Sequence, residues 1–303
     1  MEPVVESARR AADGQGRCGY AGGMSDSVVP NSVSIALVLG GGGPVGISWM
    51  AGLAIGLRDN GIDLALADRF VGTSAGAVVG AVLADGGDPA RLLRPPSTPA
   101  SPARADPARM AEIFAVLRAP GQDPAQARRR AGELALAAQV GDPDEHIARI
   151  GGLAGVTRWP ARDLVVTAID ITTGELRAWT KDGAASLPAA LASSTAVPGV
   201  FPPIPIDGRH YIDGGLRSPV NADLAAGADV VVILEPLAHM FPRIPSDRRL
   251  GSATEISIIP DDEAVTAIGL DVFNPAALVP AHAAGVRQAA EAASCLKDVW
   301  PNG

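Results

Sequence analysis

Residues 70–83 read FVGTSAGAVVGAVL, and this stretch decides the fold. A short apolar segment runs into Gly72-Thr73-Ser74-Ala75-Gly76, and small apolar residues compatible with a helix follow. This order is typical of a nucleophile elbow, in which a serine sits on a tight turn between a strand and a helix. The flanking glycines fit because the turn crowds the serine backbone. The pattern predicts a serine hydroxyl near the positive end of a helix, and the alternative is an ordinary loop.

A second glycine-rich turn lies upstream of the elbow. An apolar run over residues 34–39 predicts a strand, which ends in Gly40-Gly41-Gly42-Gly43-Pro44-Val45-Gly46 before a helix expected from about Ile47 to Leu57. The glycine spacing fits the loose fingerprint of a dinucleotide site. Such a site needs an acidic residue at the end of a second strand, and neither Asp63 nor Asp68 ends a convincing one. The nearby elbow favours the other interpretation, an oxyanion hole formed by the backbone N–H groups of Gly41, Gly42 and Gly43.

A serine nucleophile also needs a base, and histidine is the usual one. No histidine of the chain lies in a compelling motif; they are His146, His210, His239 and His282. Asp213 is the better candidate, because Gly214 and Gly215 let the chain fold tightly around its carboxylate. Asp-Gly-Gly alone is nevertheless more typical of a turn than of a base. The residues by themselves therefore leave the identity of the base open.

Composition excludes several classes of protein. The chain of 303 residues has a net charge of −8 and no long basic tract, which argues against binding nucleic acid. Cys18 and Cys295 lie far apart without metal-ligand spacing, so we expect no disulfide, no metal site and a reducing cytoplasm. No apolar run approaches the roughly 18–20 residues that span a bilayer. The N-terminus lacks the apolar core of a secretory signal, and residues 1–32 are expected to be a disordered tail.

Residues 33–303 are expected to form one α/β domain. Apolar runs predict strands at residues 164–170 and 229–234, the second buried on both faces as in a parallel sheet, and further strands at residues 176–180 and 255–259. Prolines mark the starts of helices within residues 88–158, which we interpret as a helical cap inserted into the domain. A final helix is expected over residues 276–300, with a break around Pro280.

Three motifs in this order resemble the patatin-like phospholipase family. They are the glycine loop ending at Gly46, the Gly72–Gly76 elbow and Asp213-Gly214-Gly215, and the resemblance covers residues 34–234 apart from the cap. It extends through residues 192–203 and to Asn221. The resemblance implies a three-layer α/β/α fold; together with the sequence pattern we expect a mostly parallel central sheet, and the inserted helical cap is the part that the resemblance does not cover. It also implies a Ser–Asp dyad without a catalytic histidine, metal or cofactor.

By this resemblance Ser74 is the nucleophile, Asp213 is its base, and Gly41, Gly42 and Gly43 hold the oxyanion. The expected substrates are carboxylic esters of lipids, and the expected setting is a cytoplasmic protein in transient contact with a membrane surface. One position departs from the family, because Val45 stands where an arginine or lysine is usual. A cation there would support the loop or attract an anionic headgroup.

Two alternatives to the dyad remain from the sequence. A conventional esterase would use a Ser-His-acid triad, with His239 or His282 as base. A non-catalytic protein that binds lipid or a partner would keep the fold without the chemistry.

Overall fold

The computed structural model describes residues 18–21, 33–94, 107–138 and 140–301. Its strands are β1 (Cys18–Ala21), β2 (Ile35–Leu39), β3 (Arg69–Gly72), β4 (Asp163–Asp170), β5 (Leu176–Trp179), β6 (Ile204–Ile206), β7 (Arg209–Asp213), β8 (Val230–Leu234) and β9 (Thr254–Ile258). Its α-helices are α2 (Gly43–Asp59), α3 (Ala75–Ala84), α4 (Pro107–Arg118), α5 (Pro124–Ala137), α6 (Pro143–Ala154), α7 (Leu187–Ser194), α8 (Asp262–Ile268) and α9 (Leu278–Leu296). Short 3₁₀ helices are η1 (Leu64–Leu66), η2 (Pro89–Leu93), η3 (Gly214–Leu216), η4 (Ala222–Ala225), η5 (Pro245–Arg248) and η6 (Pro275–Ala277).

The described strands form one mixed sheet in the order β1-β9-β8-β2-β3-β4-β7-β6, and β5 pairs with β4. The five central strands from β9 to β4 run parallel, while β1, β5, β6 and β7 pair antiparallel. Every residue of β2 and β8 is buried, as expected for parallel strands covered on both faces. Leu39 pairs with both Gly72 and Leu234, so β2, β3 and β8 end at the same edge of the sheet.

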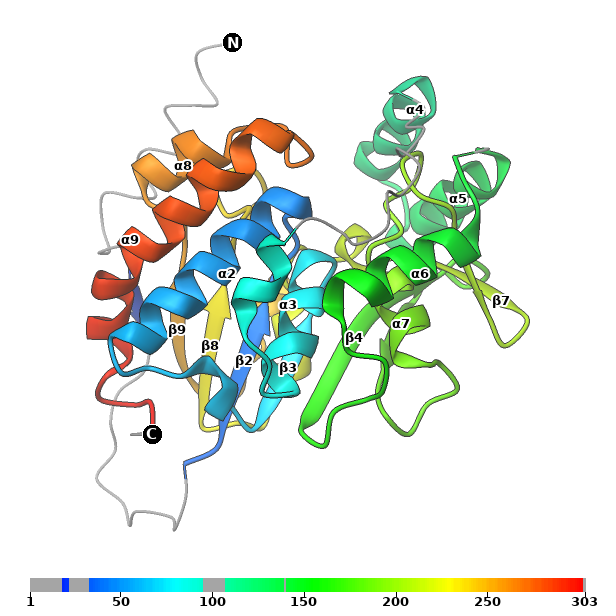
Figure 1. Ribbon diagram of the computed structural model, residues 1–303. Helices are drawn as coiled ribbons and strands as arrows, with labels where there is room; N and C mark the ends of the chain where they lie inside the picture. Colours follow the sequence, from blue (N-terminus) through cyan, green and yellow to red (C-terminus); the bar gives the residue numbers. More distant parts are fainter. Residues whose placement is uncertain (1–17, 22–32, 95–106, 139, 302–303) are drawn as a thin grey trace.

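Helices and loops cover the two faces of this sheet, as the family resemblance predicts. Figure 1 shows α2, α3 and α9 side by side on one face, where they enclose the main apolar core. The other face is covered by η4 and by Leu250, which follows η5, and by α5 over the end of β4. Helices α4, α5 and α6 lie between α3 and β4 in the chain, within the residues interpreted as a cap. Of these, α6 contributes Ile150 and Ala154 to the main core, whereas α4 and α5 share a smaller cluster.

Several local expectations were wrong. The first long helix begins at Gly43, inside the glycine loop, because Pro44 is well tolerated in a first helical turn. Pro280 does not break α9, since it too lies in the first turn. Within the tail expected to be disordered, residues 18–21 form β1 against β9; the rest of the tail lies outside the described residues.

Cys295 on α9 is disulfide-bonded, contrary to expectation, so the cysteines no longer argue for a reducing compartment. In the part of the chain that the structure describes, every helix is too short or too polar to cross a bilayer.

The contact between α2 and α9 is close enough to require glycine. A Cβ atom on Gly285 would lie 2.2 Å from the carbonyl oxygen of Trp49.

We therefore predict that Gly285→Ala lowers the free energy of unfolding by about 1–3 kcal/mol. Gly152, exposed on α6 with open space around it, is the matched control. Gly152→Ala should raise the free energy of unfolding by about 0.5–1 kcal/mol. Urea denaturation of both variants checks this, and an unchanged Gly285→Ala protein would contradict the packing described.

Candidate active site

The predicted elbow is a tight turn between β3 and α3. Ser74 has φ 54° and ψ −117°, a strained backbone conformation for a residue with a side chain. The positions two residues before and two residues after Ser74 both require glycine, because backbone atoms of neighbouring segments approach them closely. A Cβ on Gly76 would lie 2.0 Å from the carbonyl oxygen of Leu39, and one on Gly72 would lie 2.4 Å from the Cα of Ala77. Ala75 begins α3 directly after the serine, so Ser74 lies at the positive end of that helix.

A buried polar network connects the elbow to the Asp-Gly-Gly turn. The hydroxyl oxygen of Thr73 accepts hydrogen bonds from Thr167 Oγ1 (2.9 Å) and from Asn221 Nδ2 (3.1 Å). Asn221 also lies within hydrogen-bonding distance of the Gly214 carbonyl (3.3 Å). Sequence reasoning gave Thr167 and Asn221 no role in the site. The signal available in the sequence was a polar residue within or beside an apolar stretch. Both residues are fully buried in the fold, where polar side chains need hydrogen-bond partners.

Asp213 ends β7 and is 3% exposed. Its Oδ1 accepts the N–H of Gly215 at 2.7 Å, and Gly214 packs so tightly that a Cβ there would lie 2.3 Å from Thr167 Oγ1. Burial raises the pKa of Asp213 from 3.8 to about 7, against hydrogen bonds from the Ser74 side chain and the Gly215 N–H that lower it. A carboxylate with this pKa can accept a proton near neutral pH.

The glycine loop lies directly against the serine. A Cβ on Gly41 would be 3.6 Å from the Cβ of Ser74. The N–H of Gly41, however, already donates to the carbonyl oxygen of Pro219 at 2.8 Å. The N–H groups of Gly42 and Gly43 have no acceptor among the described residues. Gly46 belongs to the first turn of α2, where its N–H donates to the Gly42 carbonyl at 2.8 Å.

The segment before α9 packs onto this loop. Val272 lies against Gly43, and its carbonyl oxygen accepts the N–H of Val45 at 3.2 Å. The side chain of Val45 is fully buried in the main core, so this position presents no polar group to a substrate.

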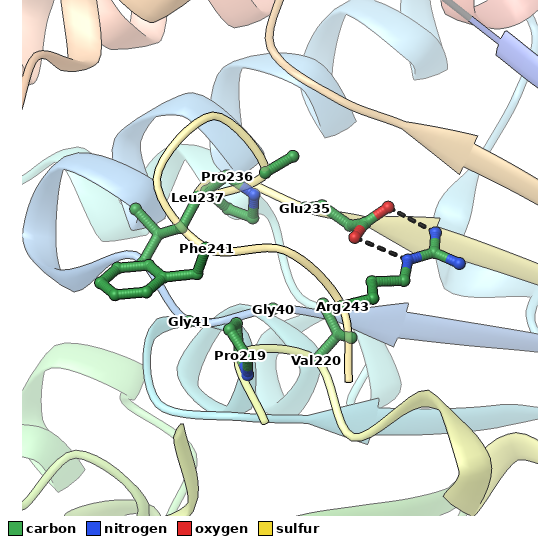
Figure 2. Close-up of a pocket in the computed structure, with 10 residues that line it drawn as sticks. Gly40, Gly41, Pro219, Val220, Glu235, Pro236, Leu237, Phe241 and Arg243 are labelled. Carbon is green, nitrogen blue, oxygen red and sulfur yellow. Dashed lines mark hydrogen bonds and ion pairs between the residues drawn. The ribbon is translucent and has the colours of Figure 1, made fainter. Parts of the chain in front are cut away.

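A small hollow lies beside the glycine loop, between Gly40 and Gly41 on one side and Phe241 and the Glu235–Arg243 ion pair on the other (Figure 2). Its volume of about 10 Å³ is enough for about one water molecule and not for an acyl chain. Arg243 also pairs with Glu255, so its charge is compensated by two carboxylates. Ser74 does not line this hollow, so the hollow belongs to the packing around the glycine loop and not to the site at Ser74.

The histidines proposed as alternative bases make other contacts. His239 Nε2 lies 3.4 Å from the carbonyl oxygen of Gly269, and burial lowers the pKa of His239. His282 packs on Gly52, and its Nε2 is buried without a partner among the described residues. Neither ring makes a hydrogen bond to Ser74 or Asp213 within the described chain.

The raised pKa of Asp213 has a consequence for stability. Between about pH 4 and pH 7 the folded protein binds a proton that the unfolded chain releases, so this group lowers stability as pH rises through that window. Asn stays neutral, so Asp213→Asn should unfold at a higher temperature than wild type, with an advantage that grows from pH 4 to pH 7.

Thermal unfolding at several pH values checks this prediction. The control is Asp229→Asn, because Asp229 is exposed and hydrogen bonds from Ser34 lower its pKa, so its replacement should reduce stability above about pH 4. An advantage of Asp213→Asn that does not change with pH would contradict the buried-carboxyl description.

Comparisons with known proteins identify the family. Among solved structures, the crystal structure of VipD from Legionella pneumophila matches with a TM-score of 0.43 and 15% identity, over 92% of this chain and 70% of that chain. The type III effector protein ExoU matches with a TM-score of 0.35 and 15% identity, over 89% of this chain and 54% of that chain. At these scores the structural likenesses carry no argument of their own. The sequence of residues 37–226, more than half of the chain, matches the family described as Patatin-like phospholipase. The chain therefore belongs to the patatin-like phospholipase family.

Proposed function

We propose that this protein is a serine acyl hydrolase that cleaves carboxylic esters of lipids, with Ser74 as nucleophile and Asp213 as base. The observation that carries the proposal is the buried Asp213 carboxyl group beside the Ser74 hydroxyl, with its pKa raised to about 7. A solvated carboxylate would be too weak a base to activate serine near neutral pH. Family membership supports the class of reaction.

The reaction proceeds through an acyl-enzyme. Asp213 accepts the hydroxyl proton as Ser74 Oγ forms a bond to the ester carbonyl carbon, and the carbonyl oxygen becomes an oxyanion. The ester C–O bond then breaks, and the leaving alcohol takes the proton from Asp213. Water attacks the acyl-enzyme carbonyl carbon as Asp213 accepts a proton from it. The bond between the acyl carbon and Ser74 Oγ then breaks, Asp213 returns the proton to Ser74 Oγ, and the carboxylic acid leaves.

The oxyanion is held by the N–H groups of Gly42 and Gly43, at the start of α2. These amides have no acceptor among the described residues, whereas the N–H of Gly41 is used by Pro219. The positive end of α2 adds to the stabilisation of negative charge. Gly41 instead ties the loop to the segment at Pro219 through this hydrogen bond. Each donor to an oxyanion is typically worth about 3–4 kcal/mol of transition-state stabilisation.

Apolar side chains near the loop favour an acyl substrate. Phe201 and Phe273 meet edge to face with ring centroids 6.1 Å apart. Phe273 follows Val272, which packs on Gly43, and Phe201 follows the loop that leaves α7. The buried Val45 adds no cation at the glycine loop, and the Arg149 guanidinium lies over the Phe201 ring, 4.6 Å from its centroid. We propose that acyl-chain contacts contribute to recognition, during transient contact with a membrane surface.

Ester hydrolysis tests the function. With p-nitrophenyl esters of increasing chain length, wild type should turn over, Ser74→Ala should be inactive, and Asp213→Asn should lose about 10²–10⁴-fold in kcat because the base is gone. A fluorophosphonate probe should label wild type and not Ser74→Ala.

The same assay distinguishes the alternatives. His239→Ala and His282→Ala should each keep kcat within about threefold of wild type, since neither ring contacts the dyad. A collapse of kcat in one histidine variant, with Asp213→Asn nearly unaffected, would establish the triad instead. A wild-type chain that neither hydrolyses esters nor accepts the probe would be a binding protein on this fold.

A further inference from the structure

We propose that residues 194–196 form a positioning bridge between Ser74 and Asp213, and that His146 on α6 holds this bridge in place. The inference rests on the proposed function, because it concerns the alignment of the same nucleophile and base. It assigns Ser194 and His146 as positioning residues that do not touch substrate.

One end of the positioning bridge holds the nucleophile. Ser194 is the last residue of α7 and is fully buried, and its Oγ accepts the backbone N–H of Ser74 at 2.8 Å. Ser74 has a strained backbone, so a fixed partner for its amide helps to keep the turn in this conformation. Without Ser194 Oγ, this buried N–H would lose its acceptor, which is unfavourable.

The other end of the positioning bridge holds the base. The carbonyl oxygen of Ala196 accepts the backbone N–H of Asp213 at 3.1 Å. Ser194 and Ala196 are two residues apart, and the peptide planes between them are rigid. The bridge therefore sets the position of the serine backbone relative to the aspartate backbone, although the two residues come from β3–α3 and β7.

The middle of the bridge is tied to the inserted helices. His146 Nε2 lies 3.0 Å from Thr195 Oγ1. Arg149, which can only donate, hydrogen-bonds His146 Nδ1, so Nε2 carries the proton and donates to Thr195. Burial, followed by the nearby Arg149 charge, lowers the pKa of His146 to about 3, which keeps the ring neutral. The ring also stacks on Phe201, with centroids 4.5 Å apart.

A displaced bridge should slow chemistry without weakening substrate binding. Small errors in the alignment of reacting groups reduce rate strongly, and neither Ser194 nor His146 is assigned a contact with substrate. The signature is therefore a fall in kcat with KM unchanged. A purely structural role would lower the melting temperature and leave kcat of the folded protein unaffected.

The chain offers a matched control one residue away. Ser193 is equally buried, but its Oγ accepts Trp179 Nε1–H at 3.1 Å and donates to the Ala190 carbonyl at 2.7 Å. With p-nitrophenyl butyrate, Ser194→Ala should lower kcat about 10–100-fold with KM within about twofold. Ser193→Ala should lower the melting temperature while kcat stays within about twofold of wild type.

Two further variants keep the test decisive if Ser194→Ala does not fold. Thr195→Val removes the hydroxyl that receives the His146 proton at nearly constant volume, and His146→Leu removes the donor itself. Each should lower kcat about 3–30-fold. The double variant should lose less than the product of the two single losses, because both variants break the His146–Thr195 hydrogen bond; Thr195 Oγ1 also bonds the Leu191 and Ala192 carbonyls, and His146 also stacks on Phe201.

Equal kcat in wild type, Ser194→Ala and Thr195→Val would overturn the bridge, and so would equal losses in Ser194→Ala and Ser193→Ala. If wild type hydrolyses the ester and the bridge variants hydrolyse it with the same kcat, the positioning proposal fails while the proposed function stands. If wild type is inert and unlabelled by the fluorophosphonate probe, the proposed function fails, and the bridge fails with it.

Discussion

The site depends on burying one carboxyl group beside a serine, and among the residues that the structure describes no cation compensates it. Asp213 is 3% exposed, and the interactions that oppose the cost of its burial come from the Ser74 side chain and the Gly215 N–H. Burial of this kind disfavours the charged form and raises the pKa toward neutrality. A neighbouring arginine would have stabilised the fold but would have made the carboxylate a weaker base. Part of the stability of the fold is therefore given up at the group that we propose as the catalytic base.

The rest of the fold holds Ser74 and Asp213 in fixed positions relative to each other. Parallel strands bring Leu39, Gly72 and Leu234 to one edge of the sheet, and the elbow fits there only because Gly76 lacks a side chain. The network through Thr73 and Asn221 joins the elbow to the Asp-Gly-Gly turn. Segments far apart in the chain thus fix the serine and the aspartate independently of any substrate, as the proposed mechanism requires.

Local pattern was enough to predict much of this arrangement. The apolar runs gave β2, β3, β4 and β8, and the spacing of small residues gave the turns around Ser74 and Asp213. The same reasoning could not predict hydrogen bonds and strand pairs between residues far apart in the chain. Nothing near Gly41 in sequence indicates that Pro219 accepts its N–H, and the stretch of small residues before Pro44 did not indicate a helix start at Gly43. β1 was missed because its pairing with β9 joins segments more than 200 residues apart.

The pH dependence of fluorophosphonate labelling at Ser74 tests the central claim most directly, because it reports the base that activates the serine without depending on the natural substrate. The rate constant should rise through an apparent pKa near 7, the value that burial gives Asp213, and the rise should persist in His239→Ala and His282→Ala. A rate that does not change between pH 5 and pH 9, or a rise that disappears with either histidine, would contradict a dyad of Ser74 and Asp213.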